Sequence, residues 1–155
     1  MFTFPFVNCV AVAQSVQRVR RRECTRDKSA GILKTTMCIE NHQAAIHDWM
    51  ASATGRLSAI ELQTKEPEKK LNAVCCMTRD MEIELKALLD PFCPAESALI
   101  NRLYKGILGD AIDLACHNPK CNNYMKDYKV TKSQNSDGII SIILRIVFSL
   151  SNSTT

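Results

Sequence analysis

The chain lacks the short motifs that mark the common catalytic and nucleotide-binding sites. It contains no G-x-S-x-G, no H-E-x-x-H, no P-loop and no G-x-G-x-x-G pattern. The sequence therefore offers no nucleophile elbow, no zinc-protease helix and no phosphate-binding loop. We expect a protein that binds rather than catalyses, without a cofactor.

Long apolar runs and a dispersed positive charge are also missing. The apolar stretches at residues 1–13 and 139–150 are too short to cross a bilayer, and Arg145 lies inside the second. The formal net charge is +4, but the cations crowd into residues 18–28 instead of covering a face. These absences predict no membrane span and no nucleic-acid partner.

Cysteine, by contrast, is abundant, with eight in 155 residues. Such usage indicates either disulfides in an oxidising compartment or metal ligands in a reducing one. The segment from Cys116 to Cys121, which includes His117, could hold zinc together with a more distant cysteine. The two closely spaced ligand pairs typical of zinc knuckles are absent, however. We therefore expect disulfides, no metal, and a secreted protein.

Residues 1–37 form the first predicted region. Ala11-Val12-Ala13 has the A-x-A form that signal peptidase cuts, here before Gln14. No Lys or Arg precedes it and Pro5 interrupts the apolar run, so a frayed N-terminus is the alternative. The basic run at residues 18–22 is interpreted as a solvated linker. We expect a possible signal peptide followed by a basic arm.

Residues 38–125 carry helical periodicity and form the second predicted region. Apolar side chains recur every three or four positions over residues 38–63, 66–89 and 94–117. Gly55 lies inside the first of these stretches, where it favours a kink. We predict an all-α fold, a small three-helix bundle of up-down-up order that is cross-linked by disulfides, with poorly ordered N- and C-terminal extensions.

Residues 126–155 differ in composition and are predicted to be a variable C-terminal tail, either a packed appendage or a tail from an alternative transcript. Residues 139–150 are rich in β-branched side chains, which by local propensity predicts a β-strand without an obvious partner. Asn152 begins a glycosylation sequon that can be used only if the chain is secreted.

The helical pattern predicts which cysteines meet. If the chain folds back near residues 64 and 92, Cys38 comes level with the end of the second helix, where Cys93 lies. We therefore predict a Cys38–Cys93 disulfide. Cys9 and Cys24 can bridge each other if the N-terminus is retained, and otherwise Cys24 has no partner within the chain.

Cys75 and Cys76 are adjacent inside the second helix. Neighbouring helical side chains diverge by about 100°, so each of the two needs a distant partner. The same folding back brings Cys116 near the pair, and Cys121, beyond a bend, can reach the other. We predict that Cys116 and Cys121 take Cys75 and Cys76, in an order that the sequence leaves open.

The stretch from Cys75 to Asp80 resembles the helix of secreted phospholipases A2, in which a Cys-Cys pair precedes a catalytic His-Asp. Here Arg79 stands where that histidine is required, and no glycine-rich calcium loop lies upstream. Without an imidazole there is no general base, so the resemblance does not carry the activity.

Two functions remain open. Trp49, Met50, Met77 and Met81 could line a pocket for an apolar ligand because methionine adapts to irregular shapes, with core filling as the alternative. His42 is interpreted as a histidine at the edge of the core. We expect an extracellular, non-catalytic binding protein that carries a small apolar ligand. The alternative is an extracellular protein-interaction or structural module with a solid core and no ligand, whose partner is an unknown protein.

Overall fold

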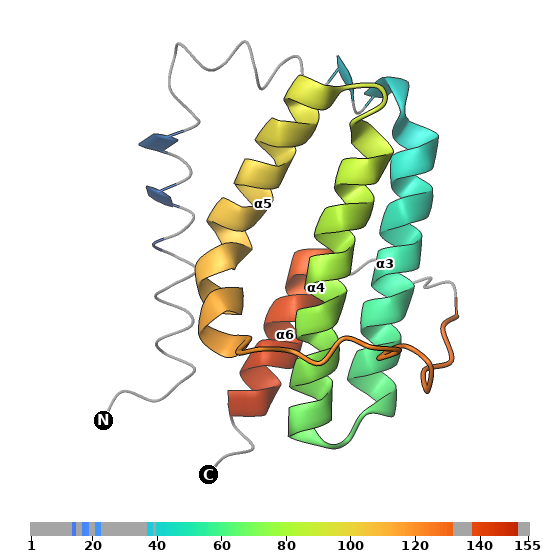
Figure 1. The fold of residues 1–155 in the computed structure, drawn as a ribbon, viewed down its shortest axis with the longest axis vertical. Coiled ribbons are helices and arrows are strands. Elements are labelled where there is room, and N and C mark those ends of the chain that lie inside the picture. Colours follow the sequence, from blue (N-terminus) through green and yellow to red (C-terminus); the bar gives the residue numbers. More distant parts are fainter. Residues whose placement is uncertain are drawn as a thin grey trace. The chain divides into compact units, whose positions relative to one another are not determined.

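The computed structural model describes residues 14, 17–18, 21–22, 37–38, 40–131 and 138–151 (Figure 1). Over these residues the chain forms α-helices and no strand, so the all-helical class is confirmed. The elements in chain order are α3 (Gln43–Gln63), α4 (Pro67–Leu89), α5 (Pro94–Ala115) and α6 (Ile139–Ser151). The expected signal peptide, Cys9, Cys24 and the Asn152 sequon lie outside the described residues.

The ends of the helices follow from local chemistry. Both α4 and α5 begin at a proline, whose fixed φ and missing N–H suit the first helical position. Glu68 and Glu96 lie in the first turns, where a carboxylate meets the positive end of the helix dipole. The Cys93 carbonyl accepts from the Ser97 amide at 2.8 Å and so makes the first hydrogen bond of α5. α3 continues through Gly55 without a break.

The packing divides the chain into two units, which are described separately. The first unit comprises Met1–Ile46 and Glu82–Leu114, and the second comprises His47–Met81 and Ala115–Thr155. The boundary falls inside helices, so α3 and α4 each contribute residues to both units.

The second unit contains most of the fully buried side chains. Its core is formed by α3, α4 and α6 through small and medium apolar residues: Ala53, Leu57, Ala59, Ile60, Ala73, Val74, Met77, Met81, Ile142, Ile143 and Ile146. Burial of one such isoleucine contributes roughly 2 kcal/mol. The hairpin of α3 and α4 is closed by the three residues between them, Thr64 to Glu66.

Residues 139–151 form a helix, and the predicted β-strand is wrong. Three isoleucines, Ile142, Ile143 and Ile146, are buried with 1% exposure or less, at the spacing of one helical face. The Arg145 guanidinium on α6 donates to both carboxylate oxygens of Glu61 on α3, at 2.5 and 2.8 Å. Tertiary packing thus overrides the strand propensity of the isoleucine run. Residues 139–151 are packed, in contrast to the poorly ordered C-terminal extension that the sequence suggested.

The first unit pairs the C-terminal turns of α4 with α5. A tight turn at residues 90–92 connects them, with the Cys93 amide donating to the Leu89 carbonyl at 2.8 Å. Leu89 and Leu99 are buried, as are both cysteines of the Cys38–Cys93 disulfide. That disulfide fastens the residues before α3 to the turn between α4 and α5.

Candidate functional site

The second unit is held by two disulfides that start from adjacent residues of α4. Cys75 bonds to Cys116 and Cys76 to Cys121, with Cα–Cα distances of 5.6 and 5.3 Å. Because neighbouring helical side chains diverge by about 100°, the two bridges leave α4 in different directions. In the entropic model each bridge contributes about 4 kcal/mol. The sequence left open which of Cys75 and Cys76 bonds to Cys116, and the structure assigns Cys75 to Cys116 and Cys76 to Cys121.

The segment that receives these disulfides, residues 116–131, is called the strap. Figure 1 shows it crossing α4 and α3. The Asn72 side chain binds the Lys120 backbone reciprocally, donating to its carbonyl at 2.8 Å and accepting from its amide at 2.7 Å. Gln63 does the same with Lys129, at 2.8 and 3.0 Å. The strap has no regular secondary structure to satisfy its backbone groups, so these two amide side chains provide hydrogen-bond partners for the backbone of Lys120 and Lys129.

Two tyrosines of the strap add further anchors. Tyr124 donates to Asp80 at 2.8 Å, and Thr64 donates to the Tyr128 hydroxyl at 2.6 Å. Asp80 is the residue that follows Arg79 in the stretch resembling phospholipases A2. In this chain its carboxylate therefore anchors the strap.

The cysteine sulfurs do not assemble a metal site in the part of the chain that the structure describes. Cys75, Cys76, Cys116 and Cys121 are bonded in disulfides, so their sulfurs cannot serve as zinc thiolates. Over the described residues no group of three or more His, Cys, Asp or Glu side chains could hold a metal ion. His117 is exposed on the strap.

In the first unit two large apolar side chains lie beside the Cys38–Cys93 disulfide. Met37 and Phe92 each precede one of its cysteines and are 57% and 60% exposed. The disulfide has a Cα–Cα distance of 6.3 Å, which keeps the Cα atoms of Met37 and Phe92 within about 14 Å of each other. His42 stacks on the Phe92 ring, with centroids 4.3 Å apart, and thereby holds an exposed aromatic ring in place. We call Met37, His42 and Phe92 the apolar corner.

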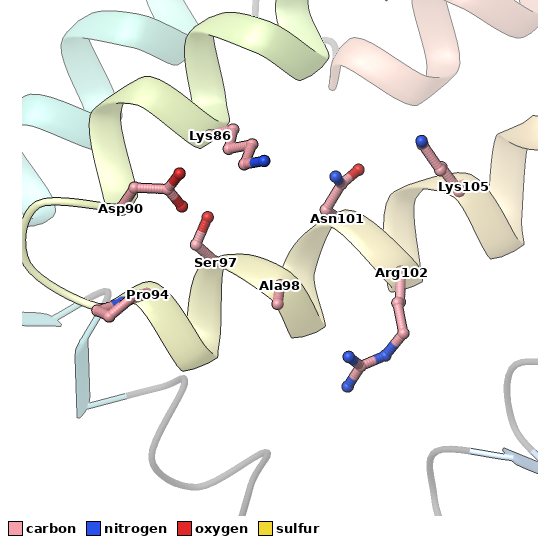
Figure 2. A pocket seen from close by; sticks show the side chains of 8 residues that line it. All are labelled: Lys86, Asp90, Pro94, Ser97, Ala98, Asn101, Arg102 and Lys105. Carbon is pink, nitrogen blue, oxygen red and sulfur yellow. The ribbon is translucent and has the colours of Figure 1, made fainter.

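The first unit also contains a cleft between α4 and α5. Its volume is about 580 Å³, and it is lined by polar and charged residues with Pro94 and Ala98: Lys86, Asp90, Ser97, Asn101, Arg102 and Lys105. Figure 2 shows the Asp90, Lys86, Ser97 and Asn101 side chains gathered where the two helices face each other, whereas Arg102 points away from them. The cleft is open to solvent, and the apolar parts of these side chains make up most of its surface.

Two buried polar atoms on α5 have no hydrogen-bond partner. They are the Oδ1 atom of Asn101, which lines the cleft, and the hydroxyl of Tyr104, one turn further along. Burial is the main reason that the pKa of the Tyr104 phenol lies well above its usual value, and the negative charge of Glu82 raises this pKa further. Glu82 forms an ion pair with Lys105, with 2.7 Å between the Lys105 Nζ and Glu82 Oε1 atoms.

The residues considered for an apolar pocket are placed mainly in the core. Met77 and Met81 are buried with 1% exposure or less, Trp49 is half-buried, and Met50 is 43% exposed. The cleft was not foreseen. In the sequence the cleft is indicated only by the polar residues Ser97, Asn101 and Lys105, which recur every four positions and therefore share one face of the helix. The apolar residues that predict this helix lie at other positions.

No protein-family model, no curated protein and no solved structure matches the chain. Among the described residues no helix has the length and apolar character needed to cross a membrane. The three disulfides fit a protein of an oxidising compartment, because thiols are kept reduced in the cytosol.

Proposed function

We propose that this protein is an extracellular, non-catalytic binding protein that recognises a partner protein through its surface. The observation that carries this proposal is the pair of exposed apolar side chains, Met37 and Phe92, beside one disulfide. Exposed apolar residues such as Leu62 and Met50 also occur in the second unit, but not beside a disulfide. Met77 and Met81, which could have lined a ligand cavity, fill the core of the second unit, whereas Met37 and Phe92 face solvent in the first. The proposal includes secretion and the up-down-up order of α3, α4 and α5.

The apolar corner has the composition of an interaction site. Aromatic and methionine side chains are enriched in protein interfaces, and few residues there supply most of the binding energy. The nearby disulfide and the His42 stack hold Phe92, which lowers the entropy lost when a partner orders the side chain. An exposed aromatic group that is already fixed is a favourable anchor for a protein partner.

A carrier of a small apolar ligand is the competing function, and a probe titration separates the two. We expect the oxidised full chain to show no saturable, stoichiometric uptake of N-phenyl-1-naphthylamine. A saturable one-to-one enhancement of the probe's fluorescence that survives replacement of Phe92 by serine would instead identify an internal apolar cavity and favour the carrier.

The interaction itself is tested by cross-linking in the extracellular fluid of the source tissue. We expect the native chain to give a discrete adduct and Phe92→Ser to lose it. Leu62→Ser is the matched control, because Leu62 is 78% exposed but lies in the second unit. An adduct that withstands Phe92→Ser, or that Leu62→Ser removes equally, would show that the apolar corner is not the interaction site.

A further inference from the structure

The cleft between α4 and α5 offers both signs of charge to a ligand. Lys86, in the last turn of α4, and Asp90, directly after the helix, are four residues apart and face the cleft. Among the described residues neither has an ion-pair partner, whereas Lys105, on the opposite helix, is paired with Glu82. One ammonium and one carboxylate are therefore available at the same opening.

Asn101, which lines the cleft, carries a buried acceptor that lacks a donor. The Oδ1 atom of Asn101 is buried and has no hydrogen-bond partner. Leaving a buried acceptor unpaired is costly, and such groups are rare in folded proteins. Ser97, one turn earlier on α5, is only 3% exposed. Its hydroxyl points to the same side of the helix as the Asn101 side chain (Figure 2). A ligand that brings a donor into the cleft would satisfy Asn101.

We propose that this cleft binds a small zwitterion of the α-amino-acid class. The ligand's ammonium donates to Asn101 Oδ1 and pairs with Asp90, while its carboxylate accepts from Lys86. The carboxylate of Asp90 disfavours a ligand that is only anionic, and Lys86 disfavours one that is only cationic. The lining contains no aromatic ring on which a neutral sugar could stack. The site is separate from the apolar corner, because none of its lining residues belongs to that corner.

The ligand class is tested by isothermal calorimetry on the oxidised full chain. The probes are a pool of the proteinogenic amino acids, L-lactate and ethanolamine. Lactate keeps the carboxylate and a neutral donor but lacks the ammonium, and ethanolamine lacks the carboxylate. We expect the amino-acid pool alone to give saturable heat. Equal binding of lactate would overturn the zwitterion assignment, and the absence of binding by all three would overturn the site.

Two substitutions locate the site. We expect Asp90→Asn and Lys86→Met each to weaken amino-acid binding by about tenfold or more, since each removes a charged partner. Lys70→Met is the matched control: this lysine also lies on α4 but does not line the cleft, so affinity should not change. Affinity that is unaffected by both cleft substitutions would contradict the proposal.

Asn101→Leu provides a readout that a purely structural asparagine would not give. Removing an unpaired buried acceptor should raise the midpoint of thermal unfolding of the ligand-free protein by about 3 °C and abolish the stabilisation by amino acids. If the midpoint falls while amino-acid binding persists, Asn101 is a structural residue and the proposed site is wrong.

Discussion

The strap of the second unit and the cleft of the first use their polar groups in different ways, although Trp49 Nε1 and Ser58 Oγ of the second unit are also buried without a hydrogen-bond partner. In the second unit, two disulfides and the side chains of Gln63, Asn72 and Asp80 fasten the strap to the helices. In the first unit, one disulfide is flanked by exposed Phe92, and a charged cleft contains the unpaired Asn101 oxygen.

This difference separates structural support from recognition. Groups that are paired within the chain lower its free energy but are not available to a ligand, whereas unpaired or exposed groups cost stability and are available. The strap with its two disulfides therefore serves as a structural frame, whereas the apolar corner and the cleft of the first unit are the places where we propose that a partner and a ligand bind.

The largest expected effect is removal of a disulfide from the second unit. Cys76→Ala with Cys121→Ala should lower the free energy of unfolding by about 4 kcal/mol, because loop entropy returns to the unfolded chain and Cys76 is fully buried. The same change at Cys38 and Cys93 should cost a similar amount, because that disulfide closes a loop of 55 residues against 45 and both of its cysteines are buried. Urea unfolding of the two double variants measures this, and a loss far below about 4 kcal/mol for Cys76→Ala with Cys121→Ala would show that this disulfide does not hold the strap to α4.

The next effect is expected from α6. Ile146→Ala should destabilise the protein by about 3 kcal/mol, because it leaves a cavity where the side chain is fully buried. Ile140→Ala is the control on the same helix, since Ile140 is 42% exposed and should cost far less. Similar losses in thermal unfolding for both variants would mean that α6 does not pack through the face containing Ile146.

A smaller effect is expected from the strap. Tyr128→Phe should cost about 1 kcal/mol, because the part-buried Thr64 hydroxyl loses its acceptor. Adding Thr64→Val removes the second partner, so the double variant should be less destabilised than the two single changes added together. Simple additivity in a double-mutant cycle would show that this hydrogen bond contributes nothing.

The first unit should lose stability at high pH through Tyr104. The raised pKa of this phenol means that the folded state keeps its proton at a pH where the unfolded state has released it. Stability is therefore fully present below the ordinary tyrosine pKa of about 10 and falls as the pH rises above it. The phenolate absorbance of native protein should show one tyrosine that ionises only on unfolding, and Tyr104→Phe should remove that step.

The sequence predicted α4 and α5 well because their limits depend on local chemistry, a proline and a first-turn glutamate at each start. The sequence prediction is wrong for α6, because the strand propensity of the β-branched residues there is outweighed by packing through Ile142, Ile143 and Ile146. Helix geometry predicted the Cys38–Cys93 disulfide and the set of partners for Cys75 and Cys76, but not which of the two bonds to Cys116. The cleft did not, because which polar residues of α4 and α5 face each other depends on the packing of the two helices.

Disulfide mapping of the protein purified from its natural source, by partial reduction and mass spectrometry, tests the structural frame most directly. We expect Cys38–Cys93, Cys75–Cys116 and Cys76–Cys121, with no free thiol among the six. Free thiols at these positions, or exchange of the partners of Cys75 and Cys76, would contradict the frame on which the assignment of the two units depends.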